Sequence, residues 1–261
     1  MLCITKRAST SSMNKAQSMS CRNRWLIVFA YAVAMAWVEA AAVLYLRTIV
    51  HRIEPWQPNP FPVIGGMASV EVAREAATLL MLLAVGMLAG RSWRSRLGFA
   101  AIAFGVWDIF YYVFLKAMCG WPHSLMDWDI LFLIPLPWWG PVLAPVLISL
   151  LLILWGTLAC RLEQTRTPVL PELAASGVGA VGAVLGLQVF MEDALAAARQ
   201  GGDAIRNVLP KNFHWPLFCA ALFLMAVPAL QLLWRRRSSQ ASEKSGSGGV
   251  APSQEQTYRA T

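Results

Sequence analysis

Residues 121–141 read WPHSLMDWDILFLIPLPWWGP and divide a very apolar chain into two parts. Proline removes a backbone donor and breaks helices, and the apolar run at 130–137 is much shorter than the roughly 20 residues that a helix needs to cross a bilayer. We therefore expect a Pro-broken extracytoplasmic hairpin or re-entrant segment that leads into the next helix. Irregular backbone at that depth must be buried by protein or line a wet cavity.

The tripeptide Trp-Asp-Ile opens the apolar part of this stretch and also occurs upstream, in WDIFYYV at 107–113. The second copy lies among tryptophans typical of a membrane interface, so we expect its carboxylate, Asp129, to be wet or nearly so. The first copy lies within a continuous apolar run. We therefore expect Asp108 to be buried and to need a partner.

The composition indicates a membrane protein with several spans. Hydrophobic residues make up 57% of the chain and charged residues only 14%, against about 25% charged residues in ordinary soluble domains. A length of 261 residues allows about six spans. The net charge of +8 favours an anionic membrane surface over nucleic acid as a partner, because the basic residues flank apolar runs instead of forming one patch.

The fold class that we predict is all-α, a polytopic transmembrane bundle of about six helices. The apolar runs place these helices at 25–50, 68–90, 97–118, 138–160, 173–197 and 214–234. Residues 1–24 form a polar, basic N-terminal tail, residues 25–237 form the membrane domain, and the Ser/Gly/Gln-rich residues 238–261 are expected to be a disordered tail.

Basic segments set the expected orientation. RSWRSR at 91–96, RLEQTR at 161–166 and the arginines at 235–237 all fall on one side of a six-span chain. The positive-inside rule makes that side, and both termini, cytoplasmic, which would suit the inner (plasma) membrane of a bacterium. Most of the acidic residues and all three histidines then fall in the outer half. We expect any chemistry to face outward.

Glu39 and the segment SVEVAREAATLL (69–80) supply the first candidate site residues. Glu39 follows alanines at four-residue spacing, a pattern that allows close helix packing, so it should point into the bundle. It is either a structural hydrogen-bond partner or a functional group. In the second segment, Glu71, Arg74, Glu75 and Thr78 share one helix face. This face is either a solvated helix end or a clamp for an anion or headgroup built on Arg74.

Asp108 is the sharpest candidate for acid–base chemistry. Tyr111 and Tyr112 follow it by three and four residues, close enough in a helix for a phenol to hydrogen-bond the carboxylate. The alternative is a structural pair with a tyrosine or with Lys116. The candidate catalytic residues are Asp108, Glu39 and Glu75. The candidate substrate-binding residues are Arg74, Glu71, Tyr111, Tyr112, His123, Asp129 and Glu192.

No cofactor or metal is predicted. The three histidines stand far apart in the chain, without the HxxH, HxxxH or HExxH spacing of metal sites, and no GxGxxG, P-loop or GxSxG motif occurs. In the last third of the chain, Gly182 and Gly186 form a GxxxG pattern, which is typical of close helix packing.

Three functions fit this pattern. The best guess is a membrane-embedded enzyme that uses its carboxyl groups on a lipid or other hydrophobic small molecule. The second is a proton-coupled transporter. The third is a non-catalytic assembly or accessory subunit, whose small-residue faces would contact a second copy or a partner membrane subunit. Carboxyl groups that converge on one pocket favour the first, and carboxyl groups that lie apart with separate partners favour the third.

Overall fold

The structure is a computed structural model that describes residues 19–57, 67–161, 169–206 and 208–247. Six of its helices are long and apolar enough to cross a membrane. These are α2 (Cys21–Ile49), α3 (Met67–Ala89), α4 (Trp93–Cys119), α5 (Leu143–Arg161), α6 (Val169–Ala198) and α8 (Trp215–Ser247). The prediction of a largely helical protein with six such helices is confirmed.

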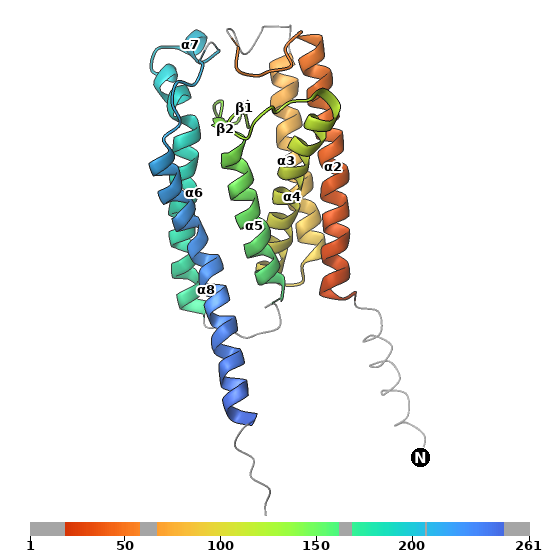
Figure 1. Cartoon of the computed structure of the whole chain (residues 1–261), viewed down its shortest axis with the longest axis vertical. Coiled ribbons are helices and arrows are strands. Elements are labelled where there is room, and N and C mark those ends of the chain that lie inside the picture. Colours follow the sequence, from red (N-terminus) through yellow and green to blue (C-terminus); the bar gives the residue numbers. More distant parts are fainter. Residues whose placement is uncertain (1–18, 58–66, 162–168, 207, 248–261) are drawn as a thin grey trace, which may run out of the picture.

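The long helices lie side by side in one bundle (Figure 1). A two-stranded sheet, β1 (Trp128–Ile130) and β2 (Trp139–Pro141), lies at one end together with the short helix α7 (Gly202–Arg206). We call this the hairpin end. The opposite end holds the start of α2 and the last turns of α8.

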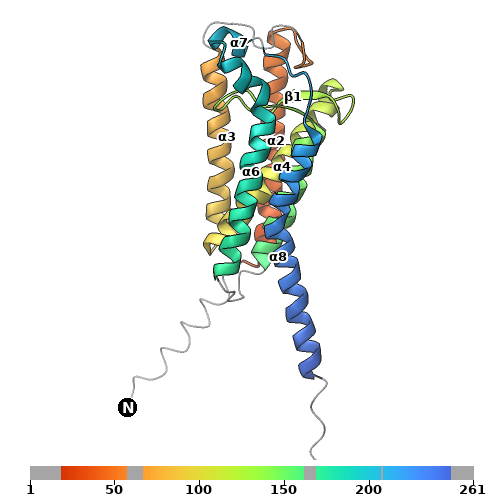
Figure 2. The ribbon, with the colours of Figure 1, turned by 90° about the vertical axis from the view of Figure 1, so that its left-hand side faces the viewer.

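The helices pack in a fixed order. Both α2 and α3 pack along α4, α4 packs on α5, α5 on α8, and α8 on α6, whereas α2 and α3 contact each other little. Figure 2 shows α3 and α8 on opposite sides of the bundle. The six long helices form two groups in chain order, α2–α3–α4 and α5–α6–α8. In each group the last helix contacts both of the others.

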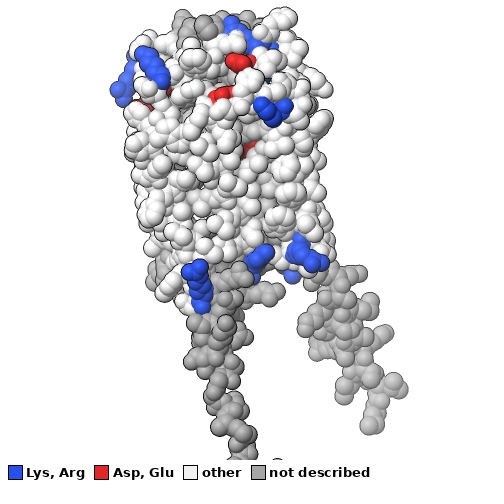
Figure 3. Space-filling model, viewed as in Figure 1, with Lys and Arg blue, Asp and Glu red and all other residues white. Residues whose placement is uncertain are grey.

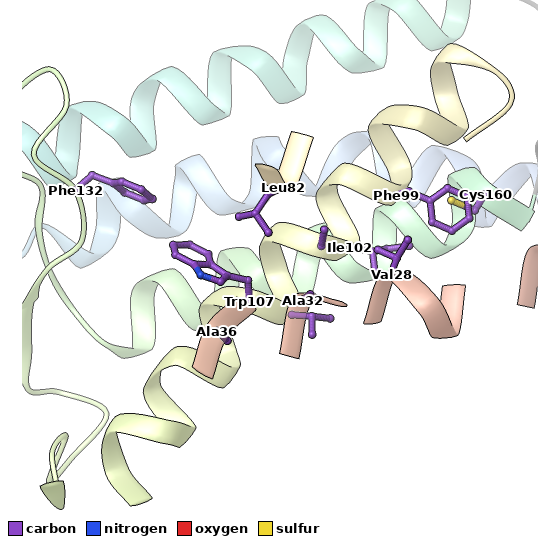
Figure 4. Close-up of a cluster of buried hydrophobic side chains, with 11 residues drawn as sticks. Val28, Ala32, Ala36, Leu82, Phe99, Ile102, Trp107, Phe132 and Cys160 are labelled. Atoms are coloured by element: carbon purple, nitrogen blue, oxygen red, sulfur yellow. The ribbon is translucent and has the colours of Figure 1, made fainter. Parts of the chain in front are cut away.

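The largest hydrophobic cluster joins α2, α3 and α4 (Figure 4). Ala32 and Ala36 of α2 are completely buried and belong to the same cluster as Phe99 and Ile102 of α4 and Leu82 of α3. Alanine leaves room for a neighbouring helix to approach closely. The alanine spacing therefore explains why α2 lies flat against α4 and turns its Glu39 face inward.

The hairpin is held by a regular backbone pairing. Strands β1 and β2 are antiparallel, with Trp128 opposite Pro141 and Ile130 opposite Trp139. Because residues 139–141 pair with β1, α5 begins at Leu143, later than the predicted start at residue 138. Trp121 and Trp139 are each only 2% exposed, so both ends of this segment are buried by protein, whereas Leu125 and Met126 are exposed. Its entry into the membrane from outside stays a prediction.

Both ends of the chain differ from the predicted boundaries. Helix α2 begins at Cys21, where the Ser20 side chain caps it by accepting a hydrogen bond from the Asn23 amide at 3.2 Å. Helix α8 continues to Ser247, ten residues into the tail that the sequence predicts to be disordered. The sequence SSQASEK after the arginines contains no helix breaker, which allows this extension. The rest of both predicted tails, 1–18 and 248–261, lies outside the described residues.

Charge is distributed unevenly along the bundle (Figure 3). On the face shown, basic residues appear at both ends, acidic residues appear only toward the hairpin end, and an uncharged band lies between them. Most acidic residues of the described chain lie in the hairpin half of their helices or in the connections at that end. Up to Asp203 the one exception among the described residues is Glu172, near the start of α6. The outer surface of the middle of the bundle is therefore apolar on the face shown, and the acidic residues are concentrated toward the hairpin end.

Candidate functional site

A pocket of about 200 Å³ lies at the hairpin end, between α2, α3, α4 and the hairpin. It extends from the buried Asp108 to Glu54, whose side chain is about half exposed, so it reaches the surface at the hairpin end. Eight of the ten predicted site residues line it: Glu39, Glu71, Arg74, Glu75, Asp108, Tyr111, Tyr112 and Asp129.

The pocket exists because α2 and α3 are held on α4 without closing on each other. Arg74 of α3 bridges the space between them. Its Nε donates to Glu71 Oε2 at 2.9 Å, a second guanidinium nitrogen bonds the other Glu71 oxygen, and a third bonds Glu39 of α2. The Thr78 hydroxyl donates to the second oxygen of Glu39 at 3.1 Å. The four polar residues predicted to share one face of α3 thus surround the pocket on that side.

This network changes the interpretation of Arg74. A guanidinium binds an external anion through donors that are still available, and Arg74 directs nitrogens at two carboxylates of the protein itself. The arrangement does not favour the clamp for an anion or headgroup. Arg74 instead compensates the charge of Glu39 and Glu71 and sets the distance between α2 and α3.

Glu75 ties α3 to the hairpin. It is 7% exposed, and its Oε2 accepts a hydrogen bond from the backbone N–H of Leu133 at 2.9 Å. Leu133 lies between the two strands, where an amide without a ladder partner needs another acceptor. Glu75 therefore fixes the loop that covers one side of the pocket, and does so through a neutral donor.

Asp108 is held by α5. It is 6% exposed, and the Ser149 hydroxyl donates to its Oδ2 at 2.8 Å. Gly105, one turn earlier in α4, permits this contact, because a Cβ atom there would lie 2.6 Å from the Ser149 carbonyl oxygen. A glycine one turn before the carboxylate therefore lets α5 approach closely enough for the serine to reach it.

The tyrosine partner that the sequence predicts for Asp108 is replaced by this serine. Tyr111 and Tyr112 line the pocket, with their ring centroids 5.0 Å apart in an edge-to-face arrangement. A phenol hydroxyl lies at the far end of a long ring, so a tyrosine one turn away reaches past a short aspartate. The Tyr112 hydroxyl accordingly lies near Asp129.

Asp129 is the clearest correction to the sequence analysis. It is 1% exposed and not wet. Arg47 of α2 donates to its Oδ1 at 2.8 Å and to the Ile53 carbonyl oxygen at 3.1 Å, and the Arg47 guanidinium lies 4.2 Å from the centroid of the Trp121 ring. The hairpin folds back over the end of α2 and buries the pair, a tertiary contact that local composition does not reveal.

Arg47 and Ser149 contribute to the site, but the sequence did not identify them, and it identified Thr78 only as part of the polar face of α3. A signal existed for Arg47, because it follows the buried Ala40 by seven residues, which is two helical turns, and so shares its face. No comparable signal marked Ser149, whose importance depends on how α4 and α5 pack.

The pocket thus holds two kinds of carboxyl group. Glu39, Glu71 and Asp129 are paired with arginine. Glu75 and Asp108 accept hydrogen bonds from an amide and a hydroxyl, both neutral groups. A cationic partner favours the charged form of a carboxyl group, whereas a neutral donor can bond the group with or without its proton. Glu75 and Asp108 are therefore the groups suited to proton transfer.

Two predicted site residues lie outside this pocket. His123 Nε2 lies 3.3 Å from Glu54 in a neighbouring hollow, and Glu192 of α6 lies 3.3 Å from His214. Both of these pairs are exposed. Among the described residues, no three His, Cys, Asp or Glu side chains come together in a group that could hold a metal ion.

Comparisons of the chain with protein-family models, with curated proteins and with solved structures find no match. The chemistry of the pocket is the basis for a functional assignment.

Proposed function

We propose that the protein is a membrane-embedded enzyme that transfers protons to or from a hydrophobic substrate in the pocket at the hairpin end. The observation that carries the proposal is the meeting of Asp108 and Glu75, from two helices, in one pocket, each with a neutral hydrogen-bond partner. General acid–base catalysis needs groups of this kind within reach of one substrate. Glu39, the third candidate catalytic residue, becomes a positioning residue because Arg74 holds it.

The surroundings support a hydrophobic substrate. Trp107, Tyr111, Phe132 and aliphatic residues of α2 line the same pocket as the carboxyl groups. Pockets that bind small molecules are typically apolar, with a few polar groups that fix orientation. We propose that a molecule dissolved in the bilayer enters between α2 and α3, which contact each other little. In the proposed orientation the hairpin end faces away from the cytoplasm, because the basic segment 91–96 and Arg161 lie at the opposite end, although Arg52 and Arg199 lie at the hairpin end.

The test is an untargeted mass-spectrometric comparison of lipid and hydrophobic-metabolite extracts. The samples are cells without the gene, cells with the wild-type gene, and cells with Asp108→Asn or Glu75→Gln at matched membrane expression. Asp127→Asn is the control, because Asp127 lies in the segment between α4 and α5, directly before β1, and does not line the pocket.

We expect one species to change in the deletion strain and in both pocket variants but not in the control. The mass difference between that species and its precursor would identify the reaction. Indistinguishable extracts, with normal insertion of every variant, would contradict the enzyme and leave the transporter and the accessory subunit as candidates.

A proton-coupled transporter is the second candidate, and the packing order favours it. In both halves of the chain the third helix contacts the first two, α4 with α2 and α3, and α8 with α5 and α6. Repeated halves of opposite orientation are a common transporter design. A transporter would leave the extracts unchanged but give an uptake or efflux defect in Asp108→Asn cells.

A further inference from the structure

The pocket carries more carboxyl groups than cations. Six carboxyl groups and three guanidinium groups line it. The carboxyl groups belong to Glu39, Glu54, Glu71, Glu75, Asp108 and Asp129, and the guanidinium groups to Arg47, Arg52 and Arg74. If Asp108 and Glu75 both held a proton, the charged carboxylates would still outnumber the guanidinium groups. Since low-dielectric walls strengthen every charge interaction, the pocket favours positive charge and opposes negative charge.

Two of the three guanidinium groups of the pocket, those of Arg47 and Arg74, are bonded to acceptors of the protein itself, and Arg52 also has an interaction within the protein. Arg74 is engaged by Glu71 and Glu39, and Arg47 by Asp129 and the Ile53 carbonyl oxygen. Binding an anion would require these pairs to break, which is costly for buried groups. A cationic ligand requires no such break, because Asp108 and Glu75 have no arginine bonded to them among the described residues.

A second observation points to a missing hydrogen-bond donor. The Oδ2 atom of Asp129 is buried and has no donor with good hydrogen-bond geometry among the described residues, although the Ile130 backbone N–H and the Tyr112 hydroxyl both lie near the carboxylate. Asp129 lines the pocket and is 1% exposed. A buried carboxylate oxygen without a donor is rare in proteins and costs free energy. A ligand that carries an N–H or a positive charge would remove that cost.

The aromatic walls fit a cation as well. The rings of Trp107 and Tyr111 are stacked with centroids 6.4 Å apart, and Trp107 also lies 6.3 Å from Phe132. Aromatic faces attract cations, most strongly when water is excluded. The protein uses this attraction beside the pocket, where Arg47 lies over Trp121.

We infer that the pocket binds the basic group of a hydrophobic cation, such as an alkylammonium or arylammonium group, and excludes anionic headgroups. This rests on the proposed function, because it names the substrate class of the same pocket. The ammonium group would lie among Asp108, Glu75 and Asp129, and its apolar part would lie against Trp107, Tyr111 and Phe132.

The test uses the purified full chain in nanodiscs made of a neutral lipid, with isothermal titration calorimetry. The probes are three small aromatic molecules: the cation phenyltrimethylammonium, the anion benzenesulfonate and the neutral benzyl alcohol. We expect phenyltrimethylammonium to bind at least about tenfold more tightly than the other two. Asp108→Asn and Glu75→Gln should each weaken its binding by about tenfold, and Asp127→Asn should leave it unchanged.

Each other outcome overturns the inference. Equal binding of benzyl alcohol would show a merely apolar pocket, and tighter binding of benzenesulfonate would restore the anion clamp. No saturable binding of any probe, or binding that ignores both pocket variants, would mean that no cation site exists here. Because the binding assay does not depend on turnover, cation binding together with unchanged cell extracts would contradict the proposed enzyme activity but not the cation site. Extracts that change as expected, together with a preference for benzenesulfonate, would contradict the cation site but not the proposed enzyme activity.

Discussion

Two pairs of helices in this molecule meet in opposite ways. Along α6 and α8 the backbones touch: a Cβ atom at Gly182 would lie 2.7 Å from the Ala221 carbonyl oxygen, and one at Gly179 would lie 2.8 Å from the Pro228 ring. At the hairpin end of α2 and α3 the backbones stay apart, and Arg74 spans the distance to Glu39. Small residues remove space between helices, whereas long paired side chains maintain it.

The contrast explains where the pocket lies. Charged groups inside a bilayer are costly unless they are paired or face the interior of the bundle. In the first half of the chain, charged side chains are grouped around a cavity. The contact between α6 and α8 at Gly179 and Gly182 is made without charged side chains. Variants can therefore disturb either the bonded polar side chains around the pocket or the small residues at the helix contacts.

Arg74→Met should cause the largest loss of stability. It leaves Glu39 and Glu71 without their cation. Breaking a fully buried pair from one side costs about 3–5 kcal/mol, and because the Arg74 and Glu71 side chains are 25% and 20% exposed, the loss should lie near the lower end of that range. The free energy of unfolding in mixed micelles measures this. The triple variant Arg74→Met, Glu39→Gln, Glu71→Gln should recover much of the loss. A stable single variant would mean that the pair does not hold α2 and α3 at their distance.

Gly182→Ala should cost about 1–3 kcal/mol, because the added methyl group meets the backbone of α8. Gly177→Ala in the same helix is the matched control. Nothing lies within 4 Å of a Cβ atom at Gly177, so alanine should be neutral or should stabilise the helix by up to about 1 kcal/mol. Equal effects at both positions would argue against a close α6–α8 contact.

Ser149→Ala should cost about 1–2 kcal/mol, because it removes the donor to a buried carboxyl group. Gly105→Ala should reproduce the loss by pushing α5 away from α4, although it leaves the serine in place. The same unfolding assay compares them. If Gly105→Ala were harmless, the glycine would not be what lets the serine reach Asp108.

Asp108→Asn should have the smallest effect on stability, less than about 1 kcal/mol, because asparagine keeps an acceptor for Ser149. Its effect on function should be large, because an amide does not exchange a proton as a carboxyl group does. Unfolding measured beside the mass-spectrometric assay separates the two effects. A strongly destabilised Asp108→Asn protein would place Asp108 among the structural residues.

The sequence predicted the helices well because membrane spans depend on local properties, namely length and apolarity. Glu39 could be placed inside the bundle because its alanine neighbours repeat every four residues. The partners could not be predicted. Asp129 is buried because the hairpin folds over the end of α2, and Asp108 is bonded by Ser149 because Gly105 lets α5 approach. Both facts depend on how distant segments pack, which no local pattern records.

We propose that Asp108 and Glu75 exchange protons, whereas Glu39, Glu71 and Asp129 are each engaged by an arginine. The most direct measurement treats membranes with dicyclohexylcarbodiimide, a hydrophobic reagent that modifies protonated carboxyl groups, and maps the adducts by peptide mass spectrometry. We expect adducts on Asp108 and Glu75 and little on the other three. Equal labelling of Glu39 and Glu71, or no labelling of Asp108 and Glu75, would contradict it.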